Sequence, residues 1–316
     1  MTLAFLFPGQ GSQAPGMGKA LADASRAARA VFDEVDEALG ETLSALMFEG
    51  PADTLTLTEN AQPALMTASL AAMRALEAEH GVAVTAARYV AGHSLGEASA
   101  LCAAGAISLT DTARFLRARG RAMQAAVPVG EGAMAALLGA EMEQAEAVCA
   151  EGAKLGVCEI ANDNAPGQIV ISGAKAAVEA AVEAAKAAGI RKAMLLPVSA
   201  PFHCSLMAPA ADALGAVLAG MTIVAPRVPV IANVTAGPTS APDAIRANLE
   251  AQVVGKVRWR ETIAFMAADG VDRMAEAGAG KVLSGMLKRA APGVEGVALN
   301  GPEDLEAFAK SLQGAP

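Results

Sequence analysis

Short apolar runs alternate with longer stretches of helical periodicity in the first part of the chain. Residues 3–7 and 86–91 are apolar runs closed by proline or glycine, which is typical of buried parallel strands that lead into loops. Apolar residues recur with helical spacing over 17–39, 61–80 and 110–126. Strands that alternate with helices predict an α/β fold around a parallel sheet.

The pattern changes near residue 128 and keeps its new form up to residue 198. Strand-like and helix-like segments follow there in the order strand, helix, strand, strand, helix, strand. This is the order of the ferredoxin-like split motif, and about 70 residues lie near the lower end of domain sizes. The earlier alternation resumes through VPVIANV and DRMAEAG. We therefore predict a large α/β domain, 1–127 and 199–316, with a small ferredoxin-like α+β subdomain, 128–198, inserted into it.

Composition limits the classes of function. The chain has 316 residues, of which 53% are hydrophobic, so it can bury a sizeable core. Only 18% are charged, and the net charge is -9. This acidic balance argues against a nucleic-acid-binding protein, because phosphate binding needs clustered Lys and Arg.

The N-terminal segment and the cysteines bear on the compartment. The first residues, MTLAFLFPGQGSQ, contain no basic stretch and only a short apolar run, so we expect neither a signal peptide nor a membrane span. The four cysteines show no CxxC spacing, and the three histidines form no HExxH motif. We therefore expect a soluble, cytoplasmic protein with reduced thiols, no metal site and no membrane partner.

A candidate nucleophile lies in Gly92-His93-Ser94-Leu95-Gly96, which matches the pattern G-x-S-x-G. An apolar strand precedes this segment and a helical stretch follows it, as the pattern requires. A strand that turns directly into a helix strains the serine backbone, and glycine at both flanks leaves room for the neighbouring chain. The motif predicts an exposed, reactive Ser94 hydroxyl; the alternative is a tight glycine turn with a capping serine.

Such a serine needs a base near neutral pH, and histidine, with a pKa of about 6.5, is the usual one. His80 lies at a helix end, and the turn should point His93 away from the hydroxyl. His203 remains as the predicted base, with a buried structural histidine as the alternative. Asp111 and Asp163 lie between the serine and this histidine, but neither follows a clear strand end. Whether a carboxylate or a main-chain carbonyl orients the imidazole stays open.

One arginine of the helical stretch 110–126 lies on its apolar face. Arg114, Arg117 and Arg121 recur at helical spacing and predict a solvated basic stripe. Arg119 has apolar or small neighbours three and four positions away and should point inward. A buried guanidinium needs an anionic partner, either a ligand carboxylate or a protein carboxylate such as Glu97.

A glycine-rich loop, PGQGSQ at 8–13, follows the first strand. The spacing Gly9-x-Gly11-x-x-Ala14 fits a loose dinucleotide-binding motif, which makes nucleotide binding the rival hypothesis. A Rossmann unit needs a second strand that ends in Asp or Glu about 20 residues after this loop, but the pattern of ARAVFDEVDEALG predicts a helix. The loop could instead direct a main-chain amide at a reacting carbonyl, with the Leu95 amide as the second donor of an oxyanion hole.

Six segments, spread in order over nearly the whole chain, resemble the malonyl-CoA:acyl carrier protein transacylase family. They are FPGQGSQ (7–13), GHSLGE (92–97), RARGRAMQ (117–124), NAPGQIVISG (164–173), SAPFHCSLM (199–207) and GAGKVLSGMLKR (278–289). The fold that the resemblance implies is an α/β-hydrolase-like large domain with a ferredoxin-like insert.

The resemblance implies a ping-pong transfer for fatty acid synthesis. Ser94 would take the malonyl group from malonyl-CoA, His203 would shuttle the proton, and the phosphopantetheine thiol of acyl carrier protein would then attack. No metal or redox cofactor would be needed, since the coenzyme A thioester is the substrate. The alternatives are a serine thioesterase or esterase, with water as acceptor, and a carrier-binding module without turnover.

The resemblance also implies roles for further residues. Arg119 would bind the malonyl carboxylate, the main-chain amides of Gln10 and Leu95 would form the oxyanion hole, and the carbonyl of Gln252 would orient the histidine. The family usually has Pro before Val-x-Trp, where this chain has Lys256-Val-Arg-Trp, so we expect that loop to differ.

Two further expectations concern selectivity and docking. Phe202 and Leu95 resemble the malonyl-selective pattern, with bulk that could exclude an extra methyl group. Because acyl carrier proteins are acidic, this acidic enzyme should offer a local basic patch. The candidates are Arg191, Lys192, Lys281, Lys288 and Arg289.

Overall fold

A computed structural model describes residues 1–313 of the chain. Its larger sheet has six strands in the order β10-β9-β1-β2-β7-β8. All neighbours pair in parallel except β7 and β8. The strands are β1 (Leu3–Phe7), β2 (Ala87–Gly92), β7 (Val230–Ile231), β8 (Pro238–Thr239), β9 (Arg273–Ala277) and β10 (Glu295–Leu299). The predicted α/β fold around a mostly parallel sheet is confirmed.

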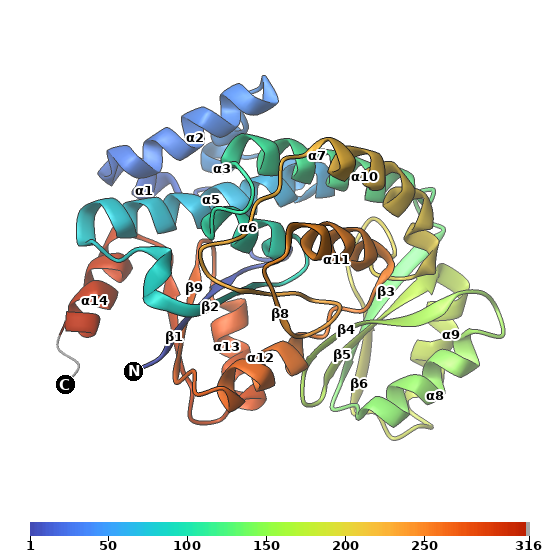
Figure 1. Cartoon of the computed structure of the whole chain (residues 1–316). Helices are drawn as coiled ribbons and strands as arrows, with labels where there is room; N and C mark the ends of the chain where they lie inside the picture. Colours follow the sequence, from blue (N-terminus) through green and yellow to red (C-terminus); the bar gives the residue numbers. More distant parts are fainter. Residues whose placement is uncertain (314–316) are drawn as a thin grey trace.

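Helices cover both faces of this sheet (Figure 1). Alternate residues of β1 explain this, because Phe5 and Phe7 belong to a core shared with α5 and α6, whereas Ala4 and Leu6 belong to a core shared with α12 and α13. The helices of this part are α1 (Lys19–Ala24), α2 (Arg26–Leu39), α3 (Leu43–Glu49), α4 (Ala52–Thr56), α5 (Thr58–His80), α6 (Leu95–Ala103), α7 (Leu109–Ala125), α10 (Ala208–Gly220), α11 (Pro242–Val254), α12 (Trp259–Ala268), α13 (Val282–Ala290) and α14 (Pro302–Gln313).

The helical stretch expected over 17–39 is two helices, α1 and α2. The break falls at Ser25, which has an extended backbone and accepts a hydrogen bond from the Ala28 N–H through its hydroxyl (3.1 Å). Serine is a favoured N-cap residue, so it starts a new helix here although the apolar spacing continues. The segment expected to be a helix at 28–40 is one, which removes the second strand that a dinucleotide-binding unit needs.

The second sheet has four antiparallel strands in the order β4-β5-β3-β6. The predicted order strand, helix, strand, strand, helix, strand is confirmed. Its elements are β3 (Gly132–Leu138), α8 (Met142–Gly152), β4 (Cys158–Ala165), β5 (Gln168–Ala174), α9 (Lys175–Ala185) and β6 (Lys192–Leu195). One face of the sheet forms a separate core with α8 and α9, including Leu137, Ile171 and Val178. This arrangement supports our proposed division at 127/128 and 198/199.

The small sheet is joined to the large domain where β4 ends. The Val257 N–H donates to the Ala161 carbonyl (2.8 Å), and the Asp163 N–H donates to the Val257 carbonyl (3.0 Å). The buried Asp163 carboxylate also forms an ion pair with Arg260 (2.8 Å). These contacts hold the end of β4 against α12 and the segment that precedes it.

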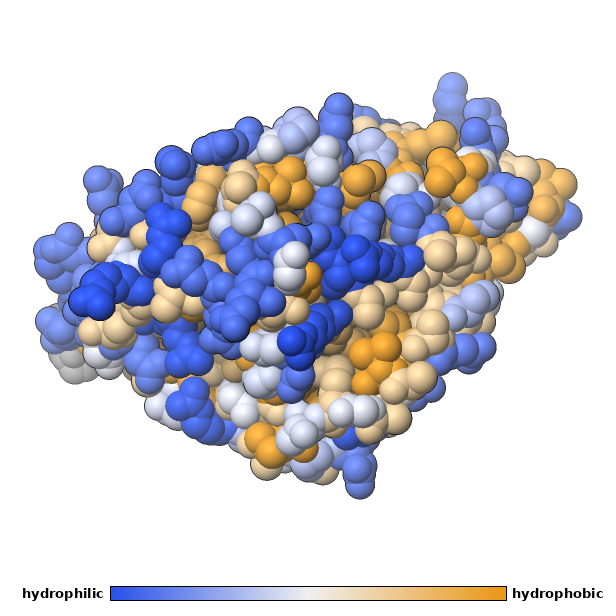
Figure 2. Space-filling model, turned by 90° about the horizontal axis from the view of Figure 1, so that it is seen from above, coloured by the Kyte–Doolittle hydropathy of each residue, from blue (hydrophilic) through white to orange (hydrophobic). Residues whose placement is uncertain are grey.

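The surface is mixed in character. On the face seen in Figure 2, hydrophilic residues gather most densely on the left half, and hydrophobic residues are more frequent on the right half. Within residues 1–313, no helix has the length and apolar character needed to span a bilayer.

Candidate active site

Ser94 lies in a sharp turn between β2 and α6, with φ 54° and ψ -113°. A Cβ atom on Gly92 would lie 1.8 Å from the Gly96 carbonyl oxygen, and one on Gly96 would lie 2.2 Å from the Phe7 carbonyl oxygen. Only glycine fits at either place, which explains the spacing of the motif. The strained serine is held by its N–H, which donates to Asn233 Oδ1 (2.8 Å).

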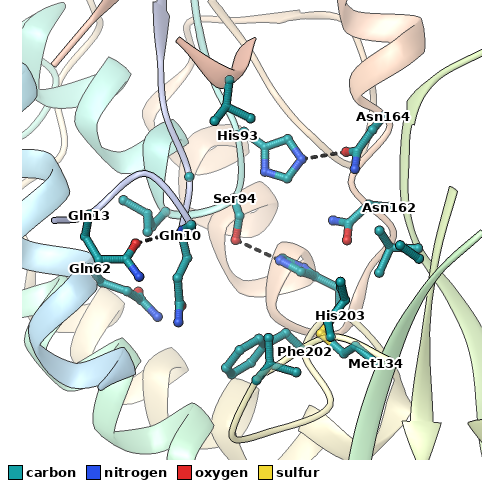
Figure 3. A pocket seen from close by; sticks show the side chains of 18 of the residues that line it. Gln10, Gln13, Gln62, His93, Ser94, Met134, Asn162, Asn164, Phe202 and His203 are labelled. Atoms are coloured by element: carbon teal, nitrogen blue, oxygen red, sulfur yellow. Dashed lines mark hydrogen bonds between the residues drawn. The ribbon is translucent and has the colours of Figure 1, made fainter. Parts of the chain in front are cut away.

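His203 contacts the serine hydroxyl: Nε2 lies 2.7 Å from Ser94 Oγ (Figure 3). The other ring nitrogen, Nδ1, donates to the main-chain carbonyl of Gln252 (2.9 Å). A carbonyl can only accept, so the proton resides on Nδ1 and Nε2 is free to take the hydroxyl proton. Burial, together with the positive charge of Arg119, lowers the pKa of His203 to about 3, which keeps the imidazole neutral.

The group that orients this imidazole was left open by the sequence, and it is a main-chain carbonyl rather than a carboxylate. Asp163 pairs with Arg260, and Asp111 lies in the first turn of α7. His80 is the last residue of α5. His93 turns away from the hydroxyl, as predicted, and its Nε2 donates to Asn164 Oδ1 (2.8 Å).

Arg119 points inward from α7, as predicted, and is only 2% exposed. Its guanidinium donates to Gln62 Oε1 (2.8 Å), to Gln252 Oε1 (2.9 Å) and to Ser94 Oγ (3.2 Å). These partners are neutral, so the ion pair with Glu97 that was considered as an alternative does not form. Burial lowers the pKa of Arg119 to about 10, which still leaves the group charged at neutral pH.

The predicted solvated stripe on α7 is wrong at Arg117. This residue is only 7% exposed, its Nη1 donates to the Glu59 carbonyl (2.8 Å), and it forms an ion pair with Glu41. The start of α5 and the segment after α2 cover this part of α7, which helical spacing cannot reveal. Arg121 is exposed and pairs with Glu59, in agreement with the prediction.

Two main-chain amides lie close to the serine. Gln10, in the loop after β1, and Leu95, the first residue of α6, both line the cavity that contains Ser94. Among the hydrogen bonds of residues 1–313, none uses the N–H of Gln10 or of Leu95 as donor. Both amides are therefore available to an oxygen atom bound at the serine.

The site opens into a cleft of about 520 Å³ between the two sheets. The large domain contributes α13 with Val282 and Met286, and the small sheet contributes Met134 and Val170. The segment 196–198, between β6 and the histidine, forms another part of the wall. This cleft is much larger than a malonyl group alone would need, and most of its lining is apolar.

Several polar residues of the site were missed by the sequence analysis. Asn162 and Asn164 line the cleft and, in a strand, share one face, which their alternation could have indicated (Figure 3). Asn233 follows the end of β7, a place where functional side chains gather in parallel sheets. Gln62 lies inside the buried α5 and carries no pattern that would identify it. The described residues include no group of three His, Cys, Asp or Glu side chains placed to hold a metal ion.

Comparisons with known proteins identify the family of the chain. The family model of the acyl transferase domain matches residues 4–300. The malonyl CoA-acyl carrier protein transacylase of Bacillus subtilis (strain 168) is 46% identical over 312 residues, covering 98% of this chain and 97% of its own. An acyl-carrier-protein-S-malonyltransferase from Bartonella henselae superimposes with a TM-score of 0.96, 55% identity and coverage of 99% and 100% of the two chains.

A further solved structure contains a partner. It is described as a type II PKS acyl-carrier protein in complex with its malonyl-transacylase, and its matching chain has a TM-score of 0.95 and 41% identity. The match covers 98% of this chain and 100% of that chain. The likeness therefore extends over the cleft and both sheets.

Proposed function

The chain belongs to the malonyl CoA-acyl carrier protein transacylase family, and from this premise we propose how its residues carry out the transfer. The activity is that of an acyl-carrier-protein S-malonyltransferase, which moves a malonyl group from malonyl-CoA to acyl carrier protein for fatty acid synthesis. One observation carries the assignment of residues: the hydroxyl of Ser94 lies within hydrogen-bond distance of both His203 (2.7 Å) and Arg119 (3.2 Å).

In the first half-reaction, Ser94 Oγ attacks the thioester carbonyl of malonyl-CoA, and His203 Nε2 takes the hydroxyl proton. The N–H groups of Gln10 and Leu95 donate to the oxyanion that forms. The carbon–sulfur bond then breaks, and the imidazolium returns its proton to the sulfur of coenzyme A. The products are the malonyl ester of Ser94 and free coenzyme A.

In the second half-reaction, the phosphopantetheine thiol of acyl carrier protein attacks the ester carbonyl. His203 takes the thiol proton and gives it to Ser94 Oγ as the carbon–oxygen bond breaks. The neutral, Nδ1-protonated imidazole that starts each half-reaction is the state favoured by the Gln252 carbonyl and by burial. The serine is restored, and the malonyl group has moved from one thiol to another.

Arg119 binds the free carboxylate of the malonyl group. Its planar guanidinium is buried beside Ser94 Oγ and is surrounded by neutral amide oxygens. A substrate carboxylate would supply the anion that these neutral partners do not. A carboxylate clamp of this kind also selects a dicarboxylic half-thioester over an acetyl thioester, whose acyl group carries no charge.

Acyl carrier protein docks near the cleft opening. Five exposed cations flank the wall segments 196–198 and 282–286, and none of them forms an ion pair within the described residues: Arg191, Lys192, Lys281, Lys288 and Arg289. Exposed cations on an enzyme with a net charge of -9 give an acidic partner a defined place of approach. The four cysteines are buried and unpaired, which supports work in the reducing cytoplasm.

The test is the covalent intermediate. After incubation with malonyl-CoA alone, the intact protein should gain the mass of one malonyl group, and Ser94→Ala should show no gain. Peptide mapping should place the group on residue 94. A malonyl adduct that persists in Ser94→Ala would refute the nucleophile assignment.

A further inference from the structure

A buried carboxyl group lies in the first turn of the helix that follows the nucleophile, and it takes no part in the steps above. Glu97 is in the first turn of α6, three residues after Ser94, and is 1% exposed. Its Oε2 accepts hydrogen bonds from the main-chain N–H of Asn233 (2.9 Å) and from Nε2 of Gln252 (2.7 Å). A buried carboxyl group is costly unless such bonds compensate it.

Both partners of Glu97 reach the reacting groups. Asn233 Oδ1 accepts from the Ser94 N–H (2.8 Å). Gln252 contacts three of them: its Nε2 donates to the Ser94 carbonyl (3.0 Å), its main-chain carbonyl accepts from His203 Nδ1 (2.9 Å), and its Oε1 accepts from Arg119 (2.9 Å). Within residues 1–313, Gln252 thus forms hydrogen bonds with the serine, the histidine and the arginine alike.

The orientation of the Gln252 amide decides whether its oxygen or its nitrogen faces Arg119. Arg119 can only donate, so the amide must turn Oε1 toward it and Nε2 away from it. On the opposite side Nε2 meets only acceptors, namely Glu97 Oε2 and Ser94 O, with Asn233 Oδ1 at 3.3 Å. A flipped amide would place its NH₂ against the guanidinium and its oxygen against the carboxyl oxygen of Glu97, so Glu97 disfavours the flip.

We propose that Glu97 is a positioning residue of this active site, which acts through the Gln252 amide to hold Arg119 where it meets the carboxylate of the substrate. This inference rests on the proposed roles of Arg119 and Gln252. Glu97 itself does not touch the substrate. Its contribution is an acceptor oxygen at a fixed place, and both of its hydrogen bonds use that one oxygen.

For this role, the acceptor oxygen of Glu97 matters more than its negative charge. Burial raises the pKa of Glu97 to about 7, while its two hydrogen bonds and the charge of Arg119 oppose the rise. When a proton binds, it can reside on Oε1 and leave Oε2 to accept both bonds. For the same reason Glu97→Gln can present its amide oxygen to both donors, whereas Glu97→Leu, of similar size, presents none.

The experiment compares two rates in each variant. The first is kcat/KM for malonyl transfer, which needs Arg119. The second is the labelling rate of Ser94 by a small, uncharged fluorophosphonate, which needs the serine, His203 and the oxyanion-hole amides but has no carboxylate for Arg119 to bind. We expect Glu97→Leu to lower malonyl transfer by about 100-fold and labelling by less than about fivefold, with Glu97→Gln within about fivefold of the unmodified protein in both.

A matched control lies on the same helix. Ser99 is also buried in α6, and its hydroxyl has no hydrogen-bond partner among the described residues. Ser99→Ala should leave both rates unchanged. Equal losses of labelling and malonyl transfer in Glu97→Leu would mean that Glu97 has a merely structural role. No loss in either rate would mean that Glu97 has no role in the site.

A double-mutant cycle tests the route through the amide. Gln252→Met keeps the size of the side chain and removes the amide, so it should produce the same selective loss of malonyl transfer. Adding Glu97→Leu to Gln252→Met should change malonyl transfer by less than about threefold further, because Glu97 then has no Gln252 amide to hold in place. If the loss in the double variant equals the product of the losses in the two single variants, the proposal is overturned.

The outcomes separate this inference from the proposed function. If Glu97→Leu fails to fold, as judged by circular dichroism and thermal melting, Gln252→Met alone decides between selective and equal loss. If the unmodified protein forms no malonyl adduct at Ser94, the proposed function fails. If the adduct forms and Glu97→Leu behaves like the unmodified protein, only this inference fails.

Discussion

At the scale of single residues, the site depends on a glycine where close main-chain atoms exclude any side chain. Gly96 lets the start of α6 approach β1, because an added Cβ would lie 2.2 Å from the Phe7 carbonyl oxygen and 3.0 Å from that of Pro8. Main-chain atoms of a central strand cannot move aside as the end of a flexible side chain can. The glycine therefore determines where the serine sits.

Gly96→Ala should lower both stability and activity. Overpacking of this kind costs about 1–3 kcal/mol, and the displaced turn should also separate Ser94 from the Leu95 amide and from His203. Thermal melting and the rate of malonyl-adduct formation measure the two effects. Gly220→Ala, where a Cβ meets no heavy atom within 4 Å, is the control and should change neither. An active, fully stable Gly96→Ala would contradict this view of the turn.

Arg119→Ala should separate substrates by charge. We expect kcat/KM for malonyl-CoA to fall by at least roughly 100-fold, about 2.7 kcal/mol, while transfer of an acetyl group is kept or improved. Steady-state kinetics with both thioesters measures the ratio. Arg121→Ala, on the exposed side of the same helix, should leave it unchanged. Equal losses for both thioesters in Arg119→Ala would instead indicate a structural role.

The pH dependence of serine labelling should be flat from about pH 5 to pH 8. The lowered pKa of His203, about 3, means that the base stays unprotonated over this range, whereas an imidazole with an ordinary pKa would be increasingly protonated below about 6.5 and the rate would fall. Labelling with an uncharged fluorophosphonate measures the profile. Since the charge of Arg119 helps to lower this pKa, Arg119→Ala should bring the fall in rate to higher pH.

At the scale of elements, α13 depends on one buried carboxylate. Glu276, near the end of β9, accepts from the N–H of Leu283 (3.1 Å) and from the N–H and hydroxyl of Ser284 (both 2.8 Å). It thus satisfies main-chain donors in the first turn of the helix that carries Val282 and Met286 to the cleft. The cations Lys288 and Arg289 lie in the last turn of the same helix.

Glu276→Ala should loosen this helix and raise the KM for acyl carrier protein and for malonyl-CoA. Loss of a cap costs about 0.5–2 kcal/mol, and Ser94 labelling should change much less than the two KM values because the serine lies on other elements. Glu303→Ala, an exposed first-turn change in α14, serves as the control. A normal KM for both substrates would mean that α13 keeps its place without this carboxylate.

The ends of helices with a long periodic pattern could be predicted from the sequence, whereas the ends of the shortest strands could not. The expected helices 61–80 and 110–126 lie within three residues of α5 and α7 at each end. Strands β7 and β8 have two residues each, which is too short for any periodicity, and they form because neighbouring strands offer hydrogen bonds. The sequence also indicated Ser94, His203 and Arg119, whereas the neutral amide of Gln62, inside the buried α5, has no sequence pattern that distinguishes it from a structural residue.

At the scale of the whole molecule, the cleft exists because two sheets are held side by side. A salt bridge between Asp163 of β4 and Arg260 of α12 ties the small sheet to the large domain, with the carboxylate buried and the arginine partly exposed. Arg260→Leu would leave the carboxylate unpaired, and we expect a loss of about 3–5 kcal/mol in unfolding free energy together with slower transfer, since Asn162 and Asn164 lie beside Asp163.

Chemical denaturation and transfer assays measure the two parts of this prediction. Arg88→Ala breaks a more exposed pair, with Asp269, and should lower the free energy of unfolding far less than Arg260→Leu does. If Arg260→Leu proved as mild as Arg88→Ala, other contacts, such as the Val257 hydrogen bonds, would be enough to hold the small sheet in place.

The order of the reacting groups along the chain has a consequence for synthesis on the ribosome. The nucleophile is made early, but its base follows the whole inserted sheet, and the carbonyl that orients the base follows later still, at Gln252. The central strand β1 also gains one of its neighbours, β9, only at Arg273–Ala277. A nascent polypeptide therefore carries a serine without its activating partner until most of the chain has been made, and its hydroxyl is not activated before then.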